Sequence, residues 1–295
     1  MTFAKKLKTI CKQSGMSQEK LAEKIGVSRQ AITKWETDMG IPDIENIMAI
    51  SNLFNISIDE LLSNKIGMIN KSQFLYESVT EYDIDHLKYF DINLGGANKL
   101  VLSGYDGEKI YVRFASNTIV TIQNDFKVKI DDIKNRIDVD VSRKNGMTEA
   151  IAKEAVTIFV QLPNQYIDEI ELTVNAKNIE MQSLECDNIE LDVKTENVIL
   201  NNIIATVEIN CNLDMNILCH SLNGAIEINQ VSATSRICVP ERLAFTAVTK
   251  GIRTRIYYEK NGEVVEDFST LNAENVIELN GIKSELIIYT AKQEV

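Results

Sequence analysis

The sequence predicts a multidomain α plus β protein, with a helical N-terminal domain (residues 1–65), a linker (66–86) and an all-β C-terminal domain (87–295). Two periodicities predict this division. Apolar residues recur every three or four positions up to about residue 63, as in helices, and every second position from about residue 87, as in strands. The length agrees, because 295 residues suit two domains better than one.

Charge is distributed unevenly between the two parts. Residues 1–42 hold eight Lys and Arg against four Asp and Glu, a balance of +4. Residues 66–295 hold 22 of the chain's 31 basic residues and 35 of its 43 acidic residues, a balance of −13. Because DNA phosphates repel an acidic surface, any contact with DNA is expected at the N-terminus.

Five short helices are predicted in the N-terminal domain. Gly15, Gly26 and Gly40 fall between the apolar-periodic segments, and Pro42 precedes the fourth of them. The fifth helix is predicted to open at residues 57–60, where Ser and Glu have the spacing of a capping box.

The second and third of these helices have the pattern of a helix-turn-helix. The stretch is SQEKLAEKIGVSRQAITKWE, residues 17–36. Ala22 is small enough for two crossing helices to approach closely, Gly26 can adopt the positive φ of a three-residue turn, and Ser28 is a favourable N-cap. A shared apolar face is predicted for Leu21, Ile25, Val27, Ile32 and Trp35.

The outward face of the third helix carries side chains that suit the DNA major groove. Arg can bond the O6 and N7 atoms of guanine, Gln can bond the N6 and N7 atoms of adenine, and hydroxyl or amide side chains suit phosphate oxygens. The competing hypothesis is a solvated polar face on a plain helical bundle. The candidate DNA-binding residues are Gln18, Ser28, Arg29, Gln30, Thr33 and Lys34.

Residues 3–63 resemble the Xre-type helix-turn-helix family, which includes phage Cro and repressor proteins. The resemblance implies a transcription regulator, commonly a repressor, that binds a near-palindromic operator in double-stranded DNA as a homodimer. It implies that Arg29, Gln30 and Lys34 contact bases. The other three candidates, Gln18, Ser28 and Thr33, would contact the sugar-phosphate backbone of the DNA. The family often has an Arg where this sequence has Cys11, so Glu36 is expected to use another partner or to face water.

Beyond residue 87 the sequence predicts short strands. The first ones are expected at residues 89–94, 99–102, 109–114 and 118–122, with a hairpin turn at residues 105–108. Residues 143–155 are expected to form a loop or a short helix.

An internal repeat occupies about residues 178–240. Its apolar centres are 9 to 11 residues apart, which gives about 19 residues for each pair of strands. This regular spacing favours a β-solenoid, with a β-sandwich of antiparallel strands as the alternative. The centres are Ile179, Ile189, Val198, Val207, Ile217, Ile226 and Ile237.

The C-terminal half is similar to the adhesin-type β-repeat domains of unknown function. The resemblance rests on residues 156–163, VTIFVQLP, and on IDEIELTVNAKNIEM with the NIE-like repeats that follow it. No defined activity comes with this resemblance.

No catalytic, cofactor or metal site is predicted. The sequence lacks the P-loop, HExxH and GxSxG motifs, and it has two histidines and no CxxC pair among its five cysteines. Five reduced, structural thiols are therefore expected. No apolar run is long enough for a membrane span or a signal peptide, so a cytoplasmic protein without a membrane partner is predicted.

The leading hypothesis is a DNA-binding repressor whose β domain dimerises the chain or answers a signal. The alternative is an interaction scaffold, in which the helical domain tethers the solenoid to DNA or to a protein partner. A third hypothesis is a sensor of a small molecule or of thiol oxidation, through Cys211, Cys219 or Cys238.

Overall fold

The computed structural model describes residues 3–13, 16–37, 39–54, 74–260 and 262–290. The chain divides into two compact units, Met1–Gln73 and Phe74–Val295, and each is described by itself.

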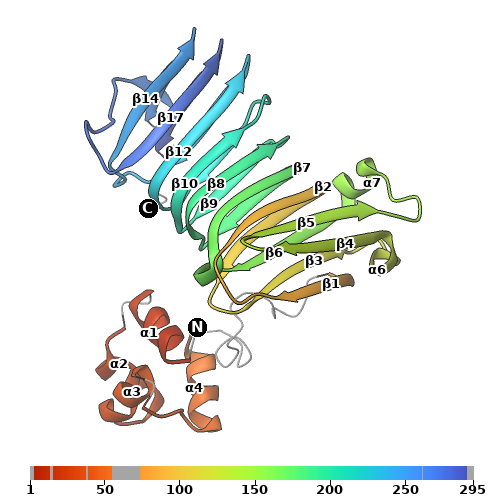
Figure 1. Ribbon diagram of the computed structural model, residues 1–295. Coiled ribbons are helices and arrows are strands. Elements are labelled where there is room, and N and C mark those ends of the chain that lie inside the picture. The colour runs from red at the N-terminus through yellow and green to blue at the C-terminus, as the bar shows by residue number, and fades with distance from the viewer. Residues whose placement is uncertain (1–2, 14–15, 38, 55–73, 261, 291–295) are drawn as a thin grey trace. The chain divides into compact units, whose positions relative to one another are not determined.

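The N-terminal unit contains four described helices (Figure 1): α1 (Phe3–Gln13), α2 (Gln18–Ile25), α3 (Arg29–Glu36) and α4 (Ile44–Phe54). Their apolar faces meet in a single cluster, as the three-to-four periodicity predicts. The fifth predicted helix lies outside the described residues. The buried members of the cluster are Leu7, Cys11, Leu21, Ala22, Ile32, Trp35, Ile47 and Ile50.

The C-terminal unit is all-β apart from three short helical turns, so the prediction of its class is confirmed. Its elements up to the repeat are β1 (Tyr76–Asp83), β2 (Lys88–Tyr105), β3 (Lys109–Ser116), α6 (Ile122–Asp125), β4 (Phe126–Ile133), β5 (Arg136–Arg143), α7 (Glu149–Ala155), β6 (Thr157–Pro163) and η1 (Asn164–Tyr166). The remaining strands are β7 (Ile167–Gln182), β8 (Glu185–Val193), β9 (Asn197–Asn201), β10 (Ile203–Asn210), β11 (Asn216–Cys219), β12 (Leu222–Val231), β13 (Thr234–Val239), β14 (Phe245–Ile252), β15 (Arg255–Lys260), β16 (Glu263–Val265), β17 (Asn275–Ile282) and β18 (Glu285–Thr290).

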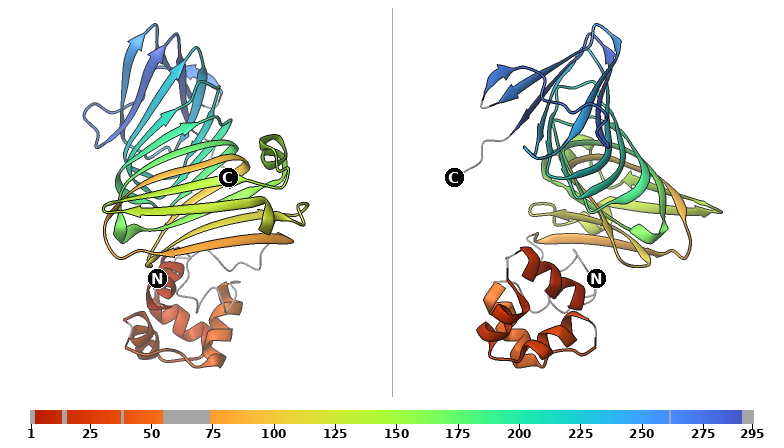
Figure 2. Two further views of the ribbon diagram at one scale, coloured as in Figure 1. Left: turned by 45° about the vertical axis from the view of Figure 1, so that its right-hand side comes forward. Right: turned by 90° about the vertical axis from the view of Figure 1, so that its left-hand side faces the viewer.

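Two rows of hydrogen-bonded strands face each other across the apolar core (Figure 2). One row runs β4, β5, β2, β7, β8, β10, β12, β17, β14. The other runs β1, β3, β6, β2, β7, β9, β11, β13, β18, β15, β16. Since β2 and β7 belong to both rows, each of these long strands passes from one row to the other.

All seven apolar centres of the repeat are buried, and they align in two ladders. The pairing from β7 to β13 is parallel, so equivalent residues of successive turns stack directly on one another. Each buried Ile or Val removes enough apolar surface from water to stabilise the fold by about 1.5–3 kcal/mol. One ladder contains Ile189, Val207 and Ile226, and the other contains Ile179, Val198, Ile217 and Ile237.

Three local predictions differ from the structure. Residues 76–83, within the predicted linker, form β1, which pairs antiparallel with β3. No strand forms at residues 118–122, because the Ser116 hydroxyl accepts the N–H groups of Thr118 and Ile119 at 3.2 and 3.1 Å and ends β3 in a turn. The prediction of a hairpin turn at residues 105–108 is wrong, because the strands on either side of it, β2 and β3, are separated by β6, which pairs with both. The short helix expected within residues 143–155 is present as α7.

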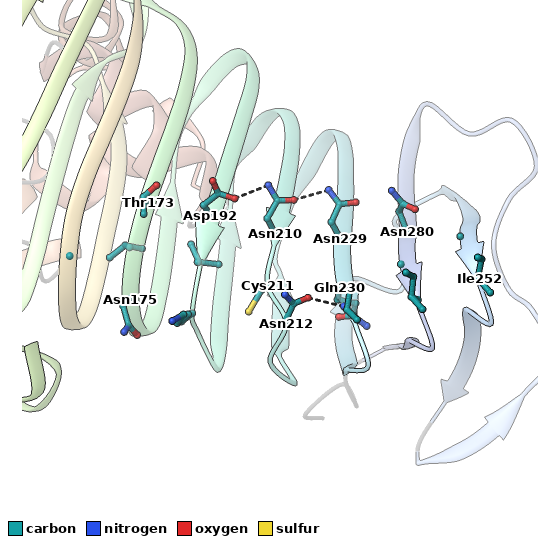
Figure 3. Close-up of a pocket in the computed structure, with 18 of the residues that line it drawn as sticks. Thr173, Asn175, Asp192, Asn210, Cys211, Asn212, Asn229, Gln230, Ile252 and Asn280 are labelled. Carbon is teal, nitrogen blue, oxygen red and sulfur yellow. Dashed lines mark hydrogen bonds between the residues drawn. The ribbon is translucent and has the colours of Figure 1, made fainter.

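A groove of about 870 Å³ follows one corner of the stack (Figure 3). An amide ladder forms part of its wall: Asn210 Nδ2 donates to Asp192 Oδ1 at 2.9 Å, and Asn229 Nδ2 donates to Asn210 Oδ1 at 2.8 Å. Such ladders link identical positions of stacked strands, so the side chains reinforce the backbone register.

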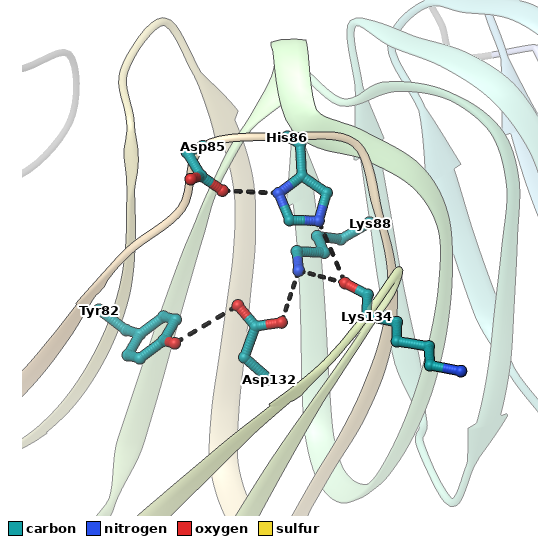
Figure 4. A network of polar contacts seen from close by, with 6 residues as sticks. All are labelled: Tyr82, Asp85, His86, Lys88, Asp132 and Lys134. Carbon is teal, nitrogen blue, oxygen red and sulfur yellow. Dashed lines mark hydrogen bonds and ion pairs between the residues drawn. The ribbon is translucent and has the colours of Figure 1, made fainter.

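A buried lysine ties two distant segments of the unit together (Figure 4). Lys88 is 1% exposed, and its Nζ donates to Asp132 Oδ1 and to the Lys134 carbonyl, both at 2.5 Å. Nearby, His86 contacts Asp85 at 2.6 Å and the same carbonyl at 3.1 Å, and the Asp85 contact raises the pKa of His86. The turn between β4 and β5 is therefore fastened to the start of β2.

Candidate nucleic-acid interface

The turn between α2 and α3 has the geometry that the sequence predicts. Gly26 is the C-cap of α2 with φ +74°, in the left-handed region, and its N–H donates to the Ala22 carbonyl. Ser28 is the N-cap of α3, and its hydroxyl accepts the Ala31 N–H at 3.2 Å. These two caps end one helix and begin the next within three residues, which sets the angle between α2 and α3.

Gly26→Ala is expected to lower the free energy of unfolding of the N-terminal unit by about 1–2 kcal/mol, because an L side chain is strained at this φ. Urea unfolding followed by the fluorescence of Trp35, the single tryptophan and part of this unit's core, measures the loss. Gly40→Ala is the control, since Gly40 has no positive φ and no neighbour within 4 Å of an added Cβ. Equal losses in both variants would contradict the strain argument.

The outward face of α3 is exposed. Arg29, Gln30, Thr33 and Lys34 are all exposed, as is the N-cap Ser28, whereas the two apolar anchors of α3 are buried. This exposure agrees with the DNA-binding hypothesis and equally with the competing hypothesis of a solvated polar face. Within this unit the polar groups of the face are open to solvent.

Glu19 holds Arg29 in the free protein. Arg29 Nη1 lies 2.8 Å from Glu19 Oε1, and both side chains are mostly exposed, 63% and 70%. Exposed pairs of this kind contribute only about 0–1 kcal/mol, so guanine or phosphate can displace the carboxylate. Glu19 is not among the residues that the sequence predicts for the site, although its place in the first turn of α2, directly after Gln18, could have suggested it.

Gln18 has a different environment from the other candidates. It is half-buried, its Nε2 donates to Glu36 Oε2 at 2.5 Å, and its Oε1 accepts from the Thr33 hydroxyl at 3.2 Å. The partner of Glu36, which the Cys11 substitution left open, is therefore Gln18. Burial, and secondarily Glu36, raises the pKa of Cys11 to about 11, so this thiol is protonated at neutral pH and suits a neutral core position.

Negative charge is concentrated on one face of the C-terminal unit. Glu171, Glu190, Glu208, Glu227 and Glu278 occupy equivalent positions on five neighbouring strands. Burial, together with the neighbouring carboxylates, raises the pKa of Glu190 and of Glu227. A row of carboxylates repels phosphates, so this face is unsuited to DNA.

Within the described ranges, no cluster of His, Cys, Asp or Glu has an arrangement that could hold a metal ion. In that same part of the chain, no helix is both long and apolar enough to span a membrane.

Comparison with known proteins identifies the N-terminal unit. Residues 7–61 match the helix-turn-helix family model, in agreement with the resemblance that residues 3–63 show. The HTH-type transcriptional activator BcrR of Enterococcus faecalis is 45% identical over 65 residues, which are 22% of this chain and 32% of that protein. The transcriptional repressor RstR of a Vibrio cholerae cryptic phage is 34% identical over 61 residues, which are 21% of this chain and 54% of that protein. The chain thus spans about a third and about half of these relatives.

Solved structures resemble the C-terminal part. A "putative cell adhesion protein" of Clostridium sporogenes aligns over 73% of this chain and 99% of its own length, at 13% identity and a TM-score of 0.35.

Proposed function

We propose that the protein is a sequence-specific DNA-binding transcription regulator. One observation carries the proposal: Arg29, Gln30 and Lys34 are exposed on α3 of a helix-turn-helix domain whose turn and caps are correctly formed. A helix fits the major groove, and its N-terminal residues come nearest to the base edges. These three side chains would contact bases.

Backbone contacts are assigned to Ser28, Thr33 and Gln18. The Ser28 oxygen already accepts from Ala31, which leaves its hydroxyl hydrogen for a phosphate oxygen. Thr33 and Gln18 are bonded to each other in the free protein, so the pair would need to exchange these bonds for phosphate contacts. If Gln18 instead keeps its hydrogen bond to Glu36 when DNA binds, its role is to hold α2 against α3.

We propose that two copies bind a near-palindromic operator. A single helix-turn-helix unit buries too little surface for strong specificity, and a two-fold dimer doubles the contacts. Repression is the proposed direction of control. The named relatives include an activator and a repressor, so a reporter gene placed behind the selected operator decides this point.

The C-terminal unit is proposed to be a β-solenoid that carries dimerisation or signal response. Parallel pairing from β7 to β13 supports a solenoid, because a meandering sandwich would have antiparallel neighbours. A helix-turn-helix domain of residues 1–65, a linker that ends before β1 at Tyr76, and a cytoplasmic location are part of this proposal. For the scaffold alternative, the structure offers the groove of Figure 3 as a partner-binding surface.

Thiol sensing has less support. Cys211, Cys219 and Cys238 are all buried, and burial raises the pKa of Cys219 to about 11. A protonated, buried thiol reacts slowly with oxidants.

Selection of bound duplexes from a random pool tests the proposed function. Two similar half-sites in inverted orientation are expected, about one helical turn or a multiple of it apart. Affinity should fall steeply between 50 and 200 mM salt, as counterion release from neutralised phosphates requires. A pool without enriched sequence at low salt would refute the proposal.

A further inference from the structure

Strand β14 ends the first row of the C-terminal unit (Figure 1), and among the described strands only β17 pairs with it. Its first residues are covered on the other side, because the Phe245 carbonyl accepts the Thr270 N–H at 2.7 Å and the Thr246 hydroxyl accepts the Ala273 N–H at 2.8 Å. Beyond these two residues, from Ala247 to Ile252, the outer edge of β14 has no pairing strand in the described part of the chain.

The chain order explains why β14 is terminal. β17 pairs with β12 on one side and with β14 on the other. It therefore lies between these two strands, although it follows both of them in the sequence. Thr249 is in register with Leu279, which is fully buried, yet Thr249 itself is exposed. The apolar core therefore ends at β14, and the side of β14 that faces the core is only partly covered.

The other free edges are shorter than β14 or carry more charge, and β16, which ends the second row, has three residues. In the second row, β16 covers the end of β15 through pairs from Tyr258–Val265 to Lys260–Glu263. At the opposite end of the stack, β4 reads FKVKIDDI and β1 reads YESVTEYD, both rich in charge. Charged side chains on an edge strand oppose pairing with another chain. β14 reads FTAVTKGI, and its one charge, Lys250, is neutralised by Glu278 at 2.8 Å.

We infer that the free edge of β14 pairs with β14 of a second copy, antiparallel about a two-fold axis. Unpaired peptide groups are best satisfied by an extended backbone. The charged edges at the other end are poor partners, so a head-to-tail contact is disfavoured and the two-fold contact closes the assembly. A register centred on Thr249 also keeps the two Lys250 side chains from facing each other.

Apolar side chains beside this edge add to the interface. Val231, Ile282 and Ile252 are equivalent residues on β12, β17 and β14, and all three are exposed, Ile252 by 65%. Figure 3 shows Ile252 at the outer end of the groove. Contact between copies would remove part of this ladder from water. The inference deepens the proposed function, which requires two helix-turn-helix units, but it is tested without DNA.

Light scattering and sedimentation velocity of the full chain test the interface. The wild type is expected to be dimeric at micromolar concentration. Thr249→Lys places a charge on each side of the two-fold axis and should weaken dimerisation about 100-fold. Ile252→Glu changes a side chain that is 65% exposed, and it should weaken dimerisation as well. Asn223→Lys, an exposed position on the internal strand β12, adds the same charge as Thr249→Lys and should leave the dimer intact.

Circular dichroism melting of each variant checks that it is folded. A monomeric wild type at 100 µM, or dimers in both edge variants, would overturn the inference. A wild type that dimerises through β14 but selects no DNA sequence would refute the proposed function alone. A chain that selects inverted half-sites while both edge variants stay dimeric would refute this inference alone.

Discussion

Arg29→Ala is expected to weaken binding to the selected operator by about 10- to 100-fold and to abolish the preference for one base in each half-site, a loss of about 1–3 kcal/mol. The guanidinium can donate two parallel hydrogen bonds to guanine, and alanine can replace neither of them. Fluorescence anisotropy on the operator and on duplexes with single base changes measures affinity and preference together.

Two control variants separate base contacts from simple charge. Lys8→Ala removes the same charge from an exposed position on α1 and should not change the base preference. Glu19→Gln releases Arg29 from its ion pair and should raise affinity for random duplexes more than for the operator. If Arg29→Ala and Gln30→Ala both kept affinity and preference intact, the model of α3 in the major groove would be wrong.

Lys88→Met is expected to lower the free energy of unfolding of the C-terminal unit by about 2–4 kcal/mol. Methionine fills a similar volume but cannot donate, so Asp132, whose side chain is 27% exposed, and the Lys134 carbonyl lose the partner that they share. Hydrogen bonds to a charged donor contribute about 1.5–3 kcal/mol each, and water can replace only part of this loss at Asp132. Urea unfolding followed by far-UV circular dichroism reports this unit, while Trp35 fluorescence reports the other.

Lys129→Met on β4 is the matched control. Lys129 pairs with Asp131 in the same hairpin, but its side chain is 60% exposed, so the loss should stay below about 1 kcal/mol. Similar losses of unfolding free energy in the two variants would show that the buried Lys88 contributes no more to stability than an exposed lysine.

The helix-turn-helix could be predicted almost residue by residue because its constraints are local. A turn of three residues needs a positive φ at Gly26 and an N-cap at Ser28, and both requirements are visible within 20 residues of sequence. The exposed face of α3 follows from the same periodicity. Contacts between helices could not be predicted, since Gln18 meets Glu36 across 18 residues.

In the β-rich unit, the repeat spacing predicted which residues are buried, and the structure confirms all seven centres. Their pairing could not be predicted in full. The period of two decides which face of a strand is apolar, but not which strand lies beside it. For that reason the hairpin at residues 105–108 was wrong, and so was the expectation that residues 76–83 form a linker.

The sequence alone therefore determined the two classes of structure, the turn and outward face of the helix-turn-helix, and the apolar ladders, because each depends on neighbours a few residues apart or on a regular period. Only the tertiary structure decided the partners of Gln18, Glu36 and Lys88, and the insertion of β17 between β12 and β14. Those contacts join segments up to 51 residues apart, from Ala225 to Val276. Their free energy comes from packing and desolvation in the folded chain, which no local pattern encodes.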